Sequence, residues 1–219
     1  MTATPYPGDL TARTPRSLMI GDLAPEFSCR TTLGSRALTD FRGRWLVFFS
    51  HPADFTPVCT SEFITFAKMQ VSFAKLNCDL LGLSVDSLFS HLAWVRSIKA
   101  RFGVEVAFPV AEDPSMAIAK AYGMIAPGAE HSGTVRACFI IDPAGIVRLI
   151  LWYPMSVGRS IVEILRCVRA LQVSDARQVL MPEGWQPGGE VIEPLSLDAD
   201  VGTNLEDWFY RTRPLEGAI

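Results

Sequence analysis

Cysteine is the residue type in this chain best suited to chemistry, and the 219 residues include five: Cys29, Cys59, Cys78, Cys138 and Cys167. No two of them form a CxxC pair, and no cysteine and histidine are spaced as zinc ligands are. An odd number of cysteines in a chain of this size also argues against a framework of disulfides. The sequence therefore predicts no metal site, and the lack of CxxC speaks against a thiol–disulfide oxidoreductase. The question becomes which single thiol is reactive.

Cys59 stands apart because it falls in the first turn of a predicted helix. Thr56 is a favoured N-cap residue, and Pro57 is a favoured first helical residue. Apolar residues follow at helical spacing, so the sequence predicts a helix over 57–76. Unpaired N–H groups and a partial positive charge at a helix N-terminus stabilise a thiolate, which is the nucleophilic form of cysteine. These features make Cys59 the candidate nucleophile.

The surrounding elements alternate between strands and helices. Continuous apolar runs predict strands over 45–50 and 80–85, and shorter signals predict strands over 26–30 and 108–110, with a polar turn over 31–36. Helices are expected over 88–102, 115–122 and 161–171, and a β-hairpin over 137–142 and 146–152. Parallel strands first and an antiparallel hairpin last predict an α/β, thioredoxin-like fold. Its central mixed sheet would be flanked by helices.

Three regions are expected along the chain: a flexible tail over 1–17, a thioredoxin-like domain over 18–173 and a C-terminal arm over 174–219. The arm is interrupted by proline and glycine, yet it keeps large apolar side chains such as Trp185, Trp208 and Phe209. A solvated tail would not keep so many of them. We expect the arm to pack on a second subunit and support dimerisation, with packing on its own domain as the alternative.

The overall composition excludes several classes of function. The net charge is −3, hydrophobic residues make up 49% of the chain and charged residues 20%, as in an ordinary globular protein. There is no run of basic residues, so we expect no nucleic-acid partner. No apolar run reaches the roughly 20 residues that span a bilayer, and the N-terminus lacks the apolar region of a secretory signal. A cytoplasmic, reducing location without a membrane partner is therefore expected.

The segment from His51 to Cys59 contains the pattern Pro-x-x-x-Thr-x-x-Cys and resembles the active-site motif of peroxiredoxins. A series of further segments resembles the one-cysteine class of that family, and they follow one another along the chain in the order found in that class. These are residues 48–52, 84–87, 91–94, 134–142, 153–154, 158–159, 163–172 and 205–209. The resemblance as a whole covers roughly residues 18–212, nearly the whole chain. The resemblance implies a thiol peroxidase with a thioredoxin-like fold and no cofactor.

The same resemblance implies roles for four residues at matching positions. Cys59 corresponds to the peroxidatic nucleophile. Thr56 and Pro52 would shape the pocket, the threonine hydroxyl by hydrogen bonding to sulfur and to a peroxide oxygen. Arg136 corresponds to an arginine that stabilises the thiolate and polarises the peroxide, which suits the fixed N–H donors of a guanidinium. The alternative for Arg136 is an ion pair at the surface.

Two more residues match positions near the pocket in this class. Arg159 corresponds to a second arginine, and His51 corresponds to a histidine near the sulfur. The alternatives are a surface role for Arg159 and a structural role at a strand end for His51. His91 is expected to have a packing or surface role, and His131 lies in a glycine-containing loop without a functional signal.

The implied reaction converts Cys59 to a sulfenic acid by attack on hydrogen peroxide or an organic hydroperoxide. An external thiol, from thioredoxin, glutathione or another donor, would then reduce it. No cysteine follows Cys167, which favours a one-cysteine cycle, and the other four thiols are expected to behave as small apolar side chains. Relatives form homodimers or larger assemblies, up to decamers. A peroxide sensor or holdase-like assembly protein is the alternative function.

Overall fold

The computed structural model describes residues 17–125, 133–195 and 209–215. The predicted tail up to residue 16, His131 and residues 205–208 lie outside these ranges. The described elements are β1 (Ser28–Thr31), β2 (Gly34–Ala37), the 3-10 helix η1 (Leu38–Phe41), β3 (Trp45–Ser50), α1 (Pro57–Lys75), β4 (Cys78–Ser84), α2 (Leu88–Phe102), β5 (Val110–Glu112), α3 (Ala117–Ala121), β6 (Arg136–Ile141), β7 (Val147–Tyr153), α4 (Ile161–Arg177), β8 (Val191–Ile192) and β9 (Thr212–Arg213).

The larger sheet has the strand order β2-β1-β5-β4-β3-β6-β7 within the described residues. β3, β4 and β5 run parallel, whereas β6 and β7 on one side and β1 and β2 on the other are antiparallel to their neighbours. The predicted mixed sheet is therefore confirmed. The turn predicted over 31–36 is shorter than expected, because Gly34, with φ of +89°, lets the chain reverse within residues 31–34 and pair β2 with β1.

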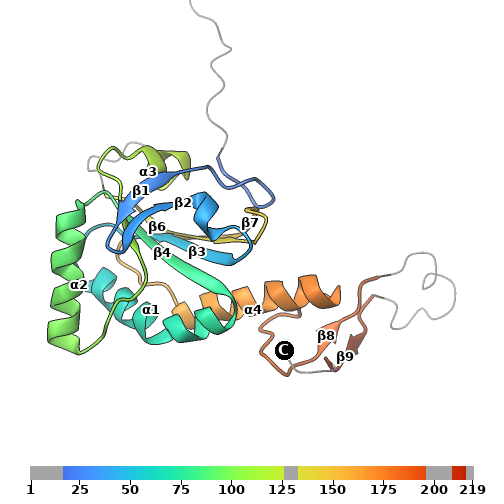
Figure 1. Ribbon diagram of the computed structural model, residues 1–219. Helices are drawn as coiled ribbons and strands as arrows, with labels where there is room; N and C mark the ends of the chain where they lie inside the picture. Colours follow the sequence, from blue (N-terminus) through green and yellow to red (C-terminus); the bar gives the residue numbers. More distant parts are fainter. Residues whose placement is uncertain (1–16, 126–132, 196–208, 216–219) are drawn as a thin grey trace, which may run out of the picture.

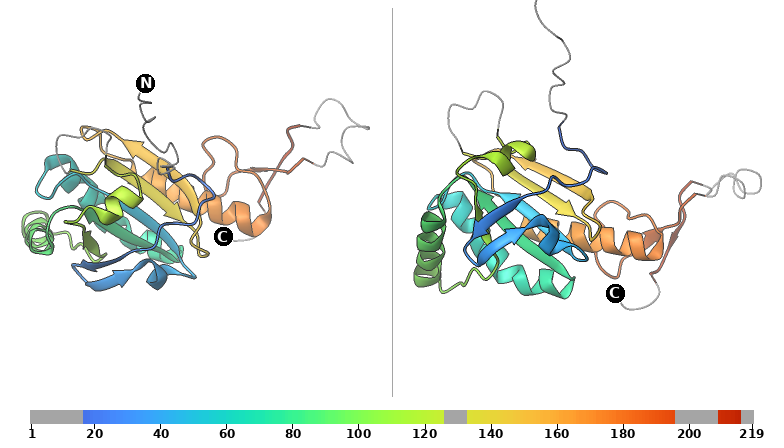
Figure 2. Two further views of the ribbon diagram at one scale, coloured as in Figure 1. Left: turned by 90° about the horizontal axis from the view of Figure 1, so that it is seen from above. Right: turned by 45° about the horizontal axis from the view of Figure 1, so that its top comes forward.

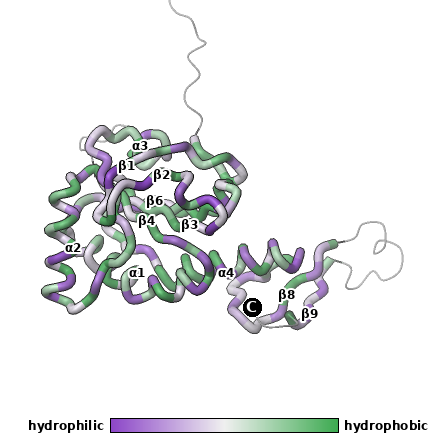
Figure 3. Tube along the Cα trace, in the orientation of Figure 1, coloured by the Kyte–Doolittle hydropathy of each residue, from purple (hydrophilic) through white to green (hydrophobic). Residues whose placement is uncertain are grey.

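Helices cover both faces of this sheet (Figure 1). On one face α1, α2 and α4 pack against Val47 and Phe49 of β3, and on the other α3 and η1 pack against Leu46 and Phe48. The alternation follows from the two-residue period of a strand. Hydrophobic residues accordingly gather along the central strands (Figure 3). β3, buried along its whole length, ends at the loop that leads into α1.

α4 is longer than the predicted 161–171 and continues to Arg177. Its C-terminal part extends beyond the sheet and carries the two-stranded β8–β9 ribbon (Figures 1 and 2). Trp185 and Val191 are buried in a small separate cluster with Val173 of α4, so this part of the arm packs on its own chain. Phe209, in contrast, is exposed in the single chain. Within the described residues, none of the helices has the length and apolar character needed to cross a bilayer.

Candidate active site

Cys59 is the third residue of α1, directly after the loop that leaves β3. Pro57 occupies the first helical position, as predicted, and Thr56 is the N-cap residue with an extended backbone. The predicted side-chain cap is not formed, because the Thr56 hydroxyl turns back and donates to the carbonyl oxygen of Ala53 at 2.9 Å. Cys59 itself is fully buried in the core between α1 and the sheet.

Arg136 contacts the Cys59 sulfur directly. It is the first residue of β6, which pairs with β3, and its Nη1 lies 3.3 Å from Sγ. Its Nε and Nη2 both donate to the carbonyl oxygen of Met155, at 3.0 and 2.8 Å, which fixes the plane of the guanidinium. The side chain is only 2% exposed, so the alternative of a surface ion pair was wrong. The arrangement can stabilise an anion on the sulfur.

Glu62 joins both arginines, although it was not predicted from the sequence. Its carboxylate accepts from the backbone N, Nε and Nη2 of Arg159 at 2.7, 2.9 and 2.8 Å, and from Nη1 of Arg136 at 3.0 Å. The signal was available, because Glu62 lies three residues after Cys59 and therefore on the same face of the helix. Arg159 also donates to the carbonyl oxygen of Ala137 at 2.6 Å.

In this cluster the negatively charged Glu62 carboxylate lies between the positively charged guanidinium groups of Arg136 and Arg159. Burial alone would raise the pKa of Glu62, but the hydrogen bonds and charge of Arg159, with the charge of Arg136, lower it below its ordinary value. Glu62 is therefore ionised at neutral pH. Arg159 is buried like Arg136, so its surface alternative was wrong as well. A thiolate at Cys59 would add a second negative charge beside two guanidinium groups.

Comparison with known proteins places this chain in a family. Residues 20–150 match the AhpC/TSA family, and residues 170–202 match the C-terminal domain of 1-Cys peroxiredoxin. This chain is a peroxiredoxin. It is thus an oxidoreductase of a thiol peroxidase family, and its fold is confirmed as thioredoxin-like.

Relatives and solved structures agree with this placement. Peroxiredoxin 2 of Caldanaerobacter subterraneus subsp. tengcongensis is 54% identical over 175 residues, which cover 80% of this chain and 79% of the relative. Peroxiredoxin of Methanosarcina mazei is 47% identical over 208 residues, 87% of this chain and 95% of the relative. A solved structure of yeast mitochondrial 1-Cys peroxiredoxin superimposes with a TM-score of 0.82 at 40% identity and covers 90% of this chain and 100% of its own.

The loop of this peroxiredoxin that leads from β3 to α1 begins with His51 and Pro52, both buried. His51 Nε2 lies 2.9 Å from Oδ1 of Asp54, and Nδ1 of His91 lies 2.8 Å from the other carboxylate oxygen. These separations are those of direct hydrogen bonds, whereas ligand atoms that each lie about 2.0–2.1 Å from a tetrahedral zinc ion are about 3.3–3.4 Å from one another. We therefore interpret the group as hydrogen-bonded rather than as a metal centre. His91 was expected in a packing or surface role; full burial excludes the surface role, and its side chain is also hydrogen-bonded to Asp54.

The other four cysteines of this peroxiredoxin are free thiols in less favourable surroundings. Burial raises the pKa of Cys138 to about 12 and of Cys167 to about 11, and it also raises the pKa of Cys78. Cys29 is half-buried, and burial together with the charge of nearby carboxylates raises its pKa to about 11. The thiolate, which is the reactive form, is disfavoured at all four positions.

Proposed function

We propose that this peroxiredoxin reduces hydrogen peroxide and organic hydroperoxides through Cys59. The contact of Arg136 Nη1 with Sγ at 3.3 Å carries the proposal, because it places a fixed cation where the thiolate must be held. In the reaction a sulfur lone pair attacks one peroxide oxygen in line and the O–O bond breaks. The departing oxygen takes a proton and leaves as water or an alcohol, and Cys59 becomes a sulfenic acid.

The surrounding residues would support this attack in different ways. Arg136 stabilises the thiolate and the charge on the departing oxygen. Arg159 acts through Glu62, which it binds with three hydrogen bonds and thereby keeps beside Arg136. The Thr56 hydroxyl donates a hydrogen bond to the carbonyl oxygen of Ala53, so its oxygen lone pairs are left to accept a hydrogen bond from a peroxide.

Two residues of the loop complete the proposed pocket. Pro52 is buried next to His51 and would restrict the approach of water to the sulfur. His51 would line the pocket from the end of β3. Cys59 is fully buried, which supports a site from which bulk water is excluded and in which electrostatic interactions are stronger.

The sulfenic acid would be reduced by an external thiol in a one-cysteine cycle. Burial and raised pKa values make the other four cysteines poor resolving thiols. The related yeast structure concerns thiol resolution by glutathione and thioredoxin systems, so these two donors are the first to test here. A reducing compartment such as the cytoplasm would keep the five thiols free. We propose a homodimer or a larger assembly such as a decamer, with the arm contributing to the contact.

The decisive experiment compares Cys59→Ser with the matched control Cys78→Ser. Stopped-flow peroxide consumption should be abolished in the first and nearly unchanged in the second. Turnover should then be measured with thioredoxin, glutathione and a small dithiol as the only reductant. Equal loss of activity in both variants would contradict the assignment of a single reactive thiol.

An alternative is a peroxide sensor or holdase-like assembly protein, which the exposed Phe209 and Tyr210 of the arm favour. Truncation after Arg177 and measurement of both assembly size and turnover separate the two functions. If turnover were negligible with each donor while oxidation changed assembly, the sensor function would be the better description.

A further inference from the structure

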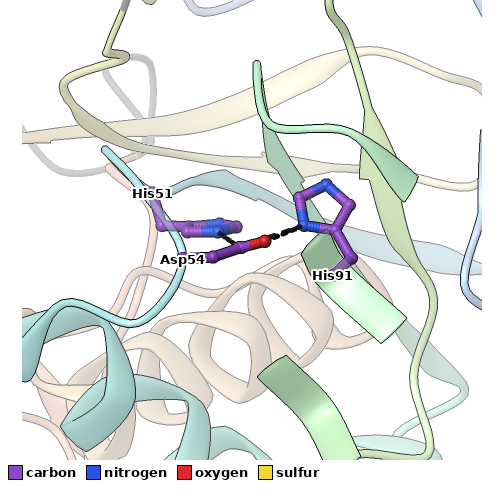
Figure 4. A group of neighbouring side chains, drawn as sticks. All are labelled: His51, Asp54 and His91. Carbon is purple, nitrogen blue, oxygen red and sulfur yellow. Dashed lines mark hydrogen bonds and ion pairs between the residues drawn. The ribbon is translucent and has the colours of Figure 1, made fainter. Parts of the chain in front are cut away.

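Asp54 lies between two buried histidines that come from different parts of the chain (Figure 4). It belongs to the loop between β3 and α1, of which His51 is the first residue, whereas His91 belongs to α2. All three side chains are at most 2% exposed. One carboxylate thus joins the start of the active-site loop to a helix on the flank of the sheet.

The hydrogen-bond partners determine where the protons of this group lie. Burial opposes ionisation of Asp54, but its hydrogen bonds to both histidines hold its pKa well below the ordinary value, so its oxygens are acceptors. His91 faces these oxygens through Nδ1, and its Nε2 lies 3.2 Å from the carbonyl oxygen of Ala111. Both ring nitrogens of His91 therefore face acceptors, and both bonds form only when the ring is an imidazolium.

His51 has the complementary protonation. Burial lowers its pKa, and the hydrogen bond and charge of Asp54 offset only part of this effect, so the ring is neutral at pH 7. Because Nε2 must donate to Asp54, the lone pair is on Nδ1. Nδ1 is buried and has no hydrogen-bond partner within the described residues. Together, the imidazolium, the carboxylate and the neutral ring have no net charge.

The charges that face this group are consistent with a cation at His91. Asp86, after β4, accepts from the backbone N–H of Asp54 at 2.9 Å and interacts electrostatically with His51. Glu112 of β5 interacts electrostatically with His91, and it is paired with Arg30 of β1. Two carboxylates, Asp86 and Glu112, therefore lie beside the group, and Arg30 is paired with one of them.

The loop needs such support because its backbone is strained. Phe55, directly after Asp54, has φ of +58°, a conformation that non-glycine residues adopt at a cost of about 1–3 kcal/mol. Its side chain is exposed and gives little packing in return. The side chain and backbone N–H of Asp54 are held by His91, His51 and Asp86, so the strained residue is fixed just before Thr56 and the helix that carries Cys59.

We propose that His91 and Asp54 are positioning residues of the peroxidase reaction: the His91 imidazolium binds the Asp54 carboxylate and so holds the 51–56 loop in the shape that presents Cys59 to peroxide. The rate consequence rests on the proposed function of Cys59. The protonation states of His51, Asp54 and His91 do not rest on that function, because they follow from the contacts among these three residues.

Two substitutions of His91 separate positioning from simple structural support. In His91→Asn the amide nitrogen lies near the former Nδ1 and can still donate to Asp54, whereas in His91→Gln it reaches toward Ala111 and the bond to Asp54 is lost. Two rate constants of Cys59 are measured, one for its reaction with peroxide and one for its alkylation by iodoacetamide. Alkylation serves as the reference because it requires no positioned peroxide, and the readout is the ratio of the first rate constant to the second. We expect this ratio to fall at least tenfold in His91→Gln and less than threefold in His91→Asn. An unchanged ratio in His91→Gln, even with a lower Tm, or an equal fall in both variants would overturn the proposal.

Histidine ¹⁵N NMR of the unmodified protein gives a test that depends neither on the variants folding nor on peroxidase activity. The chain has three histidines, and His131→Asn removes the third signal for assignment. His91, whose ring nitrogens both face acceptors, should carry a proton on each of them, and His51 should carry a proton on Nε2 alone. A neutral His91, or a proton on Nδ1 of His51, would overturn the proposal. Peroxidase activity that survives Cys59→Ser would instead refute the proposed function and leave the NMR result standing.

Discussion

Replacement of Arg136 by Gln tests the contact on which the proposed chemistry depends. The amide can still donate to the carbonyl oxygen of Met155, but the cation that lies 3.3 Å from Sγ is lost. At that distance and an effective dielectric constant of 20, the attraction between a guanidinium and a thiolate is about 5 kcal/mol. The Glu62 carboxylate accepts from the same Nη1, and its negative charge offsets part of this attraction. We therefore use the smaller free energy of a charge-assisted hydrogen bond, about 1.5–3 kcal/mol.

This free energy converts to a loss of about 10- to 150-fold in the peroxide rate constant, because each 1.36 kcal/mol is roughly a factor of ten. Single-turnover oxidation of the reduced protein, followed by stopped-flow tryptophan fluorescence at pH 7, measures it. Arg148→Gln is the matched control, since Arg148 also lies on a strand and pairs with two carboxylates, Asp142 and Asp175. It should change the rate constant by less than twofold.

The pH dependence of the Arg136 variant distinguishes two ways in which the cation acts. If Arg136 only favours the thiolate, the deficit should disappear at high pH, where every thiol is ionised. If it also stabilises charge on the departing oxygen, a deficit should persist there, and that is the result we expect. A rate constant within threefold of the unmodified protein at pH 7 would refute the reasoning.

Three further predictions concern the buried ion cluster and the arm. Arg159→Met leaves Glu62 and the carbonyl oxygen of Ala137 without their main donor, so urea denaturation should show a loss of about 3–5 kcal/mol, and a loss below 1 kcal/mol would contradict this. Because the folded pKa of Glu62 is lowered, its contribution is complete above the ordinary value near 4.5 and is lost as pH falls below it. The stability difference between the unmodified protein and Glu62→Gln should therefore shrink from pH 7 to about pH 3, and a constant difference would be the wrong result. Trp185→Ala removes the centre of the arm cluster around Val173, so hydrogen exchange should rise after residue 177 while the main unfolding transition stays in place, and a large fall of the main Tm would oppose this.

The sequence predicted the elements whose signal is local. The apolar run of β3 and the Pro57 start of α1 are determined by nearby residues, and the structure places both as expected. The β1–β2 hairpin was not predicted, because a short strand with polar residues has no clear period and its pairing depends on one glycine. The end of α4 was placed too early, because its last turns pack on the arm rather than on the sheet.

The candidate site was predictable only as far as the residues of the motif. Cys59 and Arg136 were chosen from the sequence, and the structure brings them into contact. Glu62 and Asp54 were missed, because a carboxylate is recognised as part of a site only when its partners are known. Those partners are Arg159, 97 residues away along the chain, and His91, 37 residues away. No local period encodes such pairs.

The ion cluster itself explains why a glutamate stands beside a proposed thiolate. Arg136 and Arg159 bring two positive charges into the core, and Glu62 compensates for one of them. A buried charge without a partner is costly, so the remaining positive charge favours one more anion in contact with Arg136. The sulfur of Cys59 is the group placed to supply it. Without Glu62 the two guanidinium groups would repel each other, and with a second carboxylate the charges would already balance with a neutral thiol. One carboxylate between two arginines is the arrangement in which a thiolate completes the charge balance, and Glu62→Gln should therefore change the reactivity of Cys59 as well as the stability of the fold.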